Sequence, residues 1–330
     1  MKLVEIQAEE FNKLTQSEPN SSFFQTSNWG DFYSNFEYTP YYLGYVDEQD
    51  LYSAFGLFLV QKGSFFSKKQ ALCPSGFLIN YFDTQLLKDF SKDVKKFLSK
   101  KGASNLIISP NVKYLTAKGN NDLLIKNMAD IGFIKTKSTA IYTTKIGKIK
   151  RAKATDDICL KAYTVEENNH RLFETNPNYK QLHLAMKNNA KFVVCELDCK
   201  KSLEKLTASI AECKNFNEIH QDDFEYFEKI DKNKIDIQNK QKYIELIKQI
   251  INDNANPIIA VTCLIEFNNK ITQLFIDGKK EYEAFNSLNV LKQETLKTIT
   301  KLGYESFDSI LANEDSTKTD LIGEFTYRIK

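Results

Sequence analysis

Two distant stretches of this 330-residue chain share one local pattern, which constrains the fold more than any other feature of the sequence. Residues 94–109 read VKKFLSKKGASNLIIS, and residues 295–310 read TLKTITKLGYESFDSI. In each stretch an amphipathic helix with a basic last turn is followed by a glycine, Gly102 or Gly303, and then by a short strand. This repetition indicates duplication of one α/β domain.

Strand-like and helix-like segments alternate along the rest of the chain. Asn176-Pro177 combines a helix cap with proline at the first helical position, and Asn268-Asn269 separates two apolar runs as a hairpin turn would. Strands are predicted over 41–46, 51–63, 70–81, 105–109, 139–146, 191–197, 257–267, 270–276 and 304–310. Helices are predicted over about 83–101, 120–130, 177–186, from 222, over 243–250 and over 287–302. The interruption CPSG at 73–76 predicts a turn inside the run 70–81.

Length and composition predict a folded protein with two domains. A chain of this length exceeds one comfortable core, and 42% of its residues are hydrophobic. The net charge is only +2, and the only arginines among 45 basic residues are Arg151, Arg171 and Arg328, so bidentate arginine clamps on phosphate must be few. We expect the six cysteines, including the CxxxC at 195–199, to be thiols in a reducing compartment, because no zinc-ligand spacing appears. No signal peptide or long apolar run is visible, so we expect a cytoplasmic protein.

The spacing of the 12 glycines excludes several enzyme classes. No two glycines lie closer than seven residues apart, so GxGxxG, GxxxxGK[ST] and GxSxG motifs are absent. The glycine-rich loop that would cradle the pyrophosphate of acetyl-CoA is missing as well. The three histidines suggest no local triad with a carboxylate and a nucleophile. From these observations alone, the sequence predicts a two-domain α/β protein and no particular reaction.

The order of several motifs resembles the FemX/FemA/FemB family of aminoacyl-tRNA-dependent transferases. FFQTSNWGDF at 23–32 is similar to the family's Phe-x-Gln-x-x-x-Trp segment, and CPSGFLINYFD at 73–83 is similar to its Pro-x-Gly-x-x-x-x-Tyr-x-Asp turn. Similar segments follow at 178–194 (NYKQLHLAMKNNAKFVV) and 222–250, and LIGEFTYRI at 321–329 resembles the closing Gly-Glu-Phe strand. The resemblance covers nearly the whole chain, although no counterpart of the long coiled-coil arm of the FemA branch is visible.

The resemblance implies a fold, a reaction and a set of partners. The fold would be α/β, with two GNAT-like (acyl-CoA N-acyltransferase-like) domains, mixed sheets flanked by helices and a cleft between the domains. Residues 1–150, with a closing strand at about 319–330, would form the first domain and residues 151–318 the second. The reaction would add glycine or alanine from aminoacyl-tRNA to the stem peptide of a peptidoglycan precursor, either lipid II or UDP-MurNAc-pentapeptide. Neither a metal nor a bound cofactor is implied, and we expect a monomer at or near the inner face of the membrane.

The resemblance also implies candidate site residues, at positions where this chain departs from the family in part. The catalytic lysine of the family lies in a Phe-Lys-x-Gly-Phe segment that is missing here, and Lys318 is the candidate that takes its place. Tyr33 falls where the family has a phosphate-binding lysine, and Ser109 falls where it has an aspartate before proline. The predicted substrate-binding residues are Tyr33, Ser109, Lys180, Lys240, Lys242 and Tyr243.

These departures leave two alternatives open. The protein would be a non-catalytic binding or scaffold protein on the same fold, or a GNAT-fold acyltransferase with another amine acceptor. The basic run Lys145, Lys148, Lys150, Arg151 and Lys153 would be a charged linker, with a surface for tRNA or anionic headgroups as the alternative. We expect Trp29 and His183 to be packed in the core.

Overall fold

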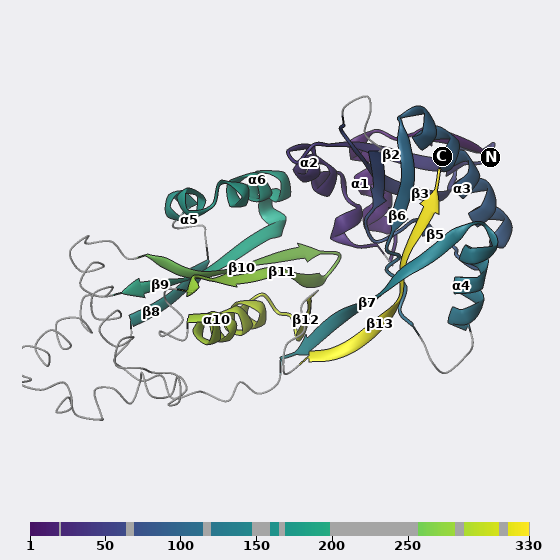
Figure 1. Ribbon diagram of the computed structural model, residues 1–330. Coiled ribbons are helices and arrows are strands. Elements are labelled where there is room, and N and C mark those ends of the chain that lie inside the picture. The colour runs from purple at the N-terminus through teal and green to yellow at the C-terminus, as the bar shows by residue number, and fades with distance from the viewer. Residues whose placement is uncertain are drawn as a thin grey trace, which may run out of the picture.

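The computed structural model describes residues 1–19, 21–63, 69–114, 120–146, 159–164, 169–198, 257–280, 287–309 and 316–329. The described strands join into one 13-stranded mixed sheet with helices on both faces (Figure 1). This is the α/β fold that the sequence predicts, with helices packed against a mixed sheet. No described helix is both long enough and apolar enough to cross a lipid bilayer.

The N-terminal half contributes two layers of helices around its strands. The elements in chain order are β1 (Lys2–Glu5), α1 (Ala8–Ser17), the 3₁₀ helix η1 (Phe23–Gln25), α2 (Ser27–Ser34), β2 (Tyr38–Val46), β3 (Tyr52–Gln61), β4 (Lys69–Cys73), β5 (Leu78–Ile79), α3 (Thr84–Lys100), β6 (Ala103–Ile108), α4 (Asn120–Asp130) and β7 (Phe133–Lys145). The predicted run 70–81 is therefore two strands, β4 and β5, separated by the CPSG turn. Strand β7 begins six residues before the predicted start at 139.

The C-terminal half repeats much of this order. Its described elements are β8 (Cys159–Thr164), α5 (Asn169–Thr175), α6 (Pro177–Met186), η3 (Lys187–Asn189), β9 (Ala190–Asp198), β10 (Ile258–Phe267), β11 (Lys270–Gly278), α10 (Ser287–Lys301), β12 (Ser306–Ser309) and β13 (Ser316–Arg328). The hairpin turns at Asn268 and Asn269, both with positive φ, as the sequence predicts. The helices predicted from 222 and over 243–250 lie outside the described residues.

The two halves of the sheet have corresponding strand orders when each is followed from its outer edge to the centre. The path is β1-β2-β3-β4-β6-β13-β7-β12-β11-β10-β9-β8, with β5 paired beside β3. In each half the strand after the helix–glycine unit, β6 or β12, pairs in parallel with a strand that precedes that helix in the chain, β4 or β11. Each of them then pairs with the last strand of the other half: β6 with β13, and β12 with β7. This exchange is the structural counterpart of the repeat seen in the sequence.

Three apolar cores hold the layers together. One packs α3 and α4 of the N-terminal half against the sheet through Leu87, Phe90 and Phe133. A second lies on the opposite face and continues from α1 and α2 to α6, and in it Trp29 and Phe192 are buried together with Met186. The third lies beneath α10. Because the second core contains residues of both halves, its burial stabilises their relative position.

The CPSG turn is fixed by close contacts around Gly76. Ser75 and Gly76 both have positive φ, of 56° and 76°, and the Gly76 amide donates a hydrogen bond to the Cys73 carbonyl. A Cβ at Gly76 would lie 2.7 Å from the Pro110 Cα and 2.6 Å from the Tyr81 hydroxyl. The turn therefore requires glycine for conformation and for space.

We predict that Gly76→Ala lowers the free energy of unfolding by about 2–4 kcal/mol, because a left-handed alanine would also overlap the Pro110 backbone. Gly303→Ala is the matched control: its φ is +87°, but nothing lies within 4 Å of the added Cβ. That variant should lose only about 1 kcal/mol. Urea denaturation followed by circular dichroism measures both losses. Equal losses would show that the Pro110 contact does not constrain the turn.

A polar cluster connects the end of α10 to the β10 strand. The Tyr304 hydroxyl donates to Glu266 over 2.5 Å, and the Lys191 ammonium lies 3.0 Å from the same carboxylate. The hydrogen bond from Tyr304, followed by that from Lys191, lowers the pKa of Glu266. Burial and the hydrogen bond to Glu266 raise the pKa of Tyr304 to about 12. The cluster thus favours a charged Glu266 and a neutral Tyr304.

We predict that the Glu266 cluster contributes fully to stability between about pH 5 and pH 9 and progressively less at lower and at higher pH. The lowered pKa of Glu266 gives stability that is present above its unfolded value of about 4.3 and disappears as the pH falls through the folded pKa. Conversely, the contribution of Tyr304 disappears as the pH rises through about 12. Glu266→Gln should cost about 1 kcal/mol at pH 7 and much less at about pH 3. Urea titrations test this, with the exposed Glu305→Gln as control; a pH-independent cost would contradict it.

Candidate functional site

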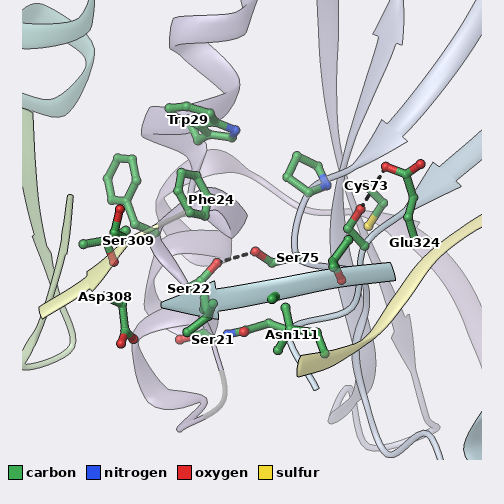
Figure 2. A pocket seen from close by; sticks show the side chains of 18 of the residues that line it. Ser21, Ser22, Phe24, Trp29, Cys73, Ser75, Asn111, Asp308, Ser309 and Glu324 are labelled. Atoms are coloured by element: carbon green, nitrogen blue, oxygen red, sulfur yellow. Dashed lines mark hydrogen bonds between the residues drawn. The ribbon is translucent and has the colours of Figure 1, made fainter. Parts of the chain in front are cut away.

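A cleft of about 690 Å³ opens where the two halves meet, beside β7 and β13 (Figure 2). Its walls come from the segment before α2, the CPSG turn, the end of β6, the middle of β7, the β10–β11 hairpin and β12. The turn that the sequence predicts at 73–76 therefore lies at the edge of this cleft. Segments far apart in the sequence build this cavity because β13 and β7 bring both halves to one place in the sheet.

Gln25 connects the first wall of the cleft to the CPSG turn. Its side chain is buried, with 1% of the residue exposed, and its amide donates to the carbonyls of Ser75 and Gly76 at 3.2 and 3.1 Å. Its amide oxygen accepts the backbone N–H of Ser22, whose hydroxyl donates to the Ser75 hydroxyl over 2.7 Å. The glutamine of the Phe-x-Gln segment therefore satisfies three buried backbone groups at once.

Aromatic rings form one wall of the cleft. Phe24, Trp29 and Tyr33 line it, and Trp29 lies 5.0 Å from Phe24 and 5.2 Å from Tyr33 between ring centroids. Trp29 is only 8% exposed and belongs to the second core, as predicted, so it supports the wall while one edge reaches the cavity. Burial raises the pKa of Tyr33, which keeps its hydroxyl neutral. This wall suits a planar ring or the apolar face of a sugar.

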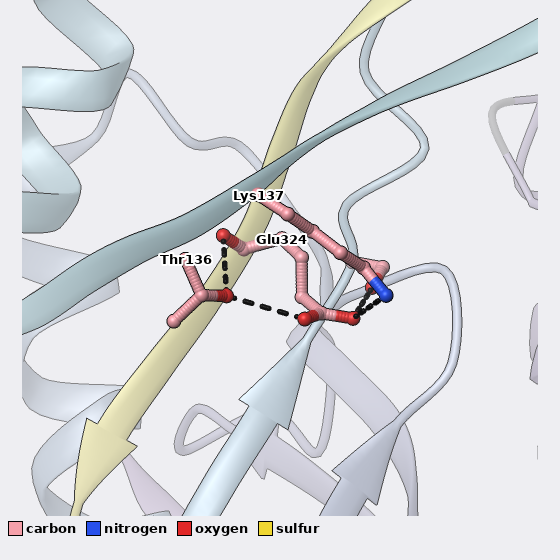
Figure 3. A network of polar contacts seen from close by, with 4 residues as sticks. Thr136, Lys137 and Glu324 are labelled. Atoms are coloured by element: carbon pink, nitrogen blue, oxygen red, sulfur yellow. Dashed lines mark hydrogen bonds and ion pairs between the residues drawn. The ribbon is translucent and has the colours of Figure 1, made fainter.

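A carboxylate, Glu324, lies on the other side of the cavity and is held by three side-chain donors and a β-bulge. Its two oxygens accept hydrogen bonds from Ser109 (3.4 Å) and Thr136 (3.2 Å), and the Lys137 ammonium lies 3.2 Å away (Figure 3). Thr136 also donates to the Glu324 carbonyl. The β13–β7 register shifts on both sides of Glu324, and the preceding Gly323 has a φ of +112°. Such bulges redirect a side chain from the regular strand, here into the cleft.

A second carboxylate, Asp308 on β12, faces the same cavity from the C-terminal half. Its Oδ1 accepts a hydrogen bond from the Thr143 hydroxyl over 2.6 Å, and the two residues are directly opposite in the β12–β7 pair. In Figure 2, Asp308 and Ser309 lie on one side of the Ser22–Ser75 hydrogen bond and Glu324 on the other. The cleft thus carries two carboxylates, Asp308 from β12 and Glu324 from β13.

Lysines supply the positive charge of the cleft. Lys113, Lys137 and Lys270 line it and are exposed. Lys137 is paired with Glu324, whereas no described carboxylate pairs with Lys113 or Lys270. Exposed ammonium groups beside a cavity attract phosphate groups without the geometric demands of arginine. Of the arginines, Arg171 is engaged with the buried Glu196 at the base of α5.

The structure brings two of the predicted site residues together and places two others elsewhere. Tyr33 and Ser109 both line the cleft. Lys318 is on β13 but not in the lining of the cleft. Its side chain is 57% exposed, its ammonium pairs with Asp320 at 2.8 Å, and that hydrogen bond raises the pKa of Lys318. Lys180 is exposed on α6 and does not line the cleft either. The other predicted residues, Lys240, Lys242 and Tyr243, lie outside the described residues, as does most of the basic run from Lys145 to Lys153.

Three residues of the cleft escaped the sequence-based prediction. Glu324 is in the Gly-Glu-Phe segment that the sequence predicts to be a strand. A glycine inside a strand often marks a β-bulge, so Gly323 is the sequence feature that could have indicated this site. Lys137 and Asp308 stand among polar residues of ordinary strands, and nothing in their spacing indicates a site. His183 is half-buried between Phe173 and Phe192, in agreement with a packed histidine.

Two further types of chemistry find no support in the described part of the chain. Cys73 lines the cleft, but it is 1% exposed, and burial raises the pKa of its thiol well above the ordinary value. A neutral thiol is a poor nucleophile. Among the described residues, no group of three or more His, Cys, Asp or Glu side chains could hold a metal ion.

The part of the chain that builds most of the cleft matches a known protein family. The sequence model of the FemAB family matches residues 6–158. This N-terminal part of the chain is therefore similar to the FemAB family. No curated protein matches the sequence. The FemAB segment contains the Phe-x-Gln-x-x-x-Trp segment, the CPSG turn and Ser109, so the motifs that suggested the family lie at the cavity.

Solved structures show that the fold extends over both halves. The crystal structure of FemX is similar with a TM-score of 0.62 and 15% identity, over 99% of this chain and 97% of FemX. A tandem GNAT protein from the clavulanic acid biosynthesis pathway gives a TM-score of 0.59 with 6% identity, over 100% of this chain and 98% of that protein. At these identities the shared property is the fold: a tandem of GNAT-like halves.

We predict that Gln25→Glu destabilises the protein by about 2–4 kcal/mol at pH 7, because a buried carboxylate would face the Ser75 and Gly76 carbonyls in place of an N–H donor. The exposed Gln49→Glu is the control and should change stability by less than about 0.5 kcal/mol. Thermal or urea unfolding measures both. Similar stabilities of the two variants would mean that Gln25 does not hold the turn.

Proposed function

We propose that this protein is an acyltransferase that moves an aminoacyl group from aminoacyl-tRNA to an amine of a peptidoglycan precursor. The observation that carries the proposal is the cleft: the FemAB segment supplies its aromatic wall and CPSG turn, and the C-terminal half completes it. The precursor would be lipid II or UDP-MurNAc-pentapeptide, and the transferred residue glycine or alanine.

The reaction requires positioning more than activation. The amine nitrogen of the acceptor attacks the ester carbonyl carbon, so that a C–N bond forms and the C–O bond to the ribose breaks. The nitrogen loses a proton, and the leaving ribose oxygen gains one. Because the ester is already activated, alignment of the two substrates and stabilisation of the developing oxyanion are the main contributions of the protein.

The geometry of the cleft supports roles for Glu324 and Lys137. The Glu324 carboxylate, held in the cavity by Ser109 and Thr136, accepts an N–H of the attacking amine and receives its proton. The Lys137 ammonium pairs with Glu324, but the lysine side chain is 64% exposed and would turn towards the oxyanion. Tyr33 contributes to the aromatic wall on which a ring of either substrate would lie. Lys113 and Lys270 attract the phosphate groups that both substrates carry.

The residues implied by the family resemblance keep separate proposed roles. Lys318 would stabilise the oxyanion after its ion pair with Asp320 opens. Lys180, Lys240, Lys242 and Tyr243 would contact the acceptor. Lys318, the candidate for the catalytic lysine, pairs with Asp320 and does not line the cleft. This observation favours a second candidate function, in which the protein binds the precursor but catalyses no transfer.

Acyl transfer from a pool of radiolabelled aminoacyl-tRNAs to UDP-MurNAc-pentapeptide and to lipid II tests the proposal. We predict transfer from one donor, and a decrease of kcat by about 10²–10⁴-fold in Glu324→Gln, because general base catalysis is lost. The exposed Glu48→Gln should leave kcat unchanged.

Several outcomes discriminate between the roles. Unchanged turnover in Glu324→Gln would remove Glu324 from the reaction, and a decrease in Lys318→Ala would support the role implied by the resemblance. If a folded protein binds the precursor in calorimetry but transfers nothing from any donor, the binding function replaces the enzyme.

A further inference from the structure

We propose that Asp308 binds the α-ammonium group of the amino acid that is transferred, and that it thereby selects a donor with a free amino group. This inference rests on the proposed function, since it assigns one end of the donor to one wall of the cleft. It adds a specificity-determining residue from the C-terminal half, which the FemAB match at residues 6–158 does not include.

Strand alternation places the Asp308 side chain at the cavity. Its neighbour Phe307 is 4% exposed and packs in the core beneath α10, so the next side chain points to the opposite face of the sheet. On that face Asp308 lines the cleft together with Thr272, its register partner on β11. The Thr143 hydroxyl behind it holds Oδ1 at 2.6 Å, which orients the carboxylate.

The two carboxylates of the cleft differ in how their charge is balanced. Glu324 has the Lys137 ammonium at 3.2 Å and two hydroxyl donors. For Asp308 the partner within the described residues is the Thr143 hydroxyl, and no described lysine or arginine forms an ion pair with it. A half-buried carboxylate without a cation gains free energy when a ligand supplies one. Asp308 is therefore the better site for a positively charged group.

The chemistry of the reaction identifies which amine this is. The attacking amine of the acceptor must be neutral when it forms the new bond, and an unbalanced carboxylate beside it would favour its charged, unreactive form. The α-amino group of the donor does not react, and its positive charge persists through the step. An unbalanced carboxylate therefore suits the donor, and the balanced Glu324 suits the acceptor.

A binding experiment that needs no turnover tests the inference. The probes are 3′-deoxy-3′-(glycylamino)adenosine, whose amide link cannot be transferred, and the same compound with an acetylated amino group. The wild-type protein should bind the free amine about 10–100-fold more tightly, which corresponds to one charge-assisted hydrogen bond. In Asp308→Asn this preference should fall below about 3-fold, while affinity for the acetylated probe stays the same.

Control variants separate charge recognition from a structural role. Asp277→Asn removes an exposed carboxylate of β11 outside the cleft and should keep the preference. Asp308→Glu retains the charge and should recover part of it, whereas Thr143→Val should weaken it by releasing Oδ1. Urea titrations confirm that each variant is folded. A wild-type protein without preference for the free amine, including one that binds neither probe, or an Asp308→Asn variant that retains the preference, would overturn the inference.

The outcome is distinguishable from that of the proposed function. If the wild-type protein transfers an amino acid and Asp308→Asn discriminates between the probes as well as the wild type does, the ammonium site is wrong and the transferase remains. If no donor is transferred but the preference depends on Asp308, the ammonium site remains and the enzymatic function is wrong.

Discussion

The antiparallel pairing of β7 with β13 is the interaction on which the rest of the structure depends. Each strand is long, follows one repeat of the helix–glycine–strand unit, and reaches across to the other half. The backbone hydrogen bonds of this pair join what would otherwise be two separate sheets into one. β7 and β13 cross from one half to the other beside the cleft. The aromatic wall and the β10–β11 hairpin line the cleft together with them.

Irregularities in these strands produce the site. A regular β13 would alternate its side chains between the two faces without interruption, but the bulge at Gly323 and Glu324 changes the alternation at the cavity. At another wall of the cleft, the CPSG turn has a left-handed conformation at Ser75 and Gly76, and Gln25 donates hydrogen bonds to the carbonyls of both residues. Both features cost conformational free energy, and both stand at the walls of the same cavity, as strained backbone at functional sites often does.

The two carboxylates of the cleft have different surroundings, which would suit the two substrates of the proposed reaction. Glu324 is paired with the Lys137 ammonium and accepts hydrogen bonds from two hydroxyls, whereas Asp308 accepts one from Thr143 and forms no ion pair with a lysine or arginine of the described residues. A reaction between an aminoacyl ester and an amine brings two amino groups into one cavity, of which one must stay charged and the other must become neutral. In the proposed reaction, two carboxylates with different surroundings would distinguish the two amines by electrostatics, as differences in local environment separate the pKa values of paired catalytic groups in other enzymes.

The sequence by itself determined the fold class, the hairpin at Asn268-Asn269, the CPSG turn and the repeated unit, because these follow from hydrophobic periodicity and from residues with few allowed conformations. It also placed Tyr33 and Ser109 in the cleft by resemblance. The partnership of Glu324 with Lys137, the position of Asp308 opposite Thr143 and the pairing of Lys318 with Asp320 were decided by the tertiary structure. Except for the last pair, these contacts join residues that are far apart in the chain, so they depend on strand register and on a bulge, and local sequence patterns carry no information about either.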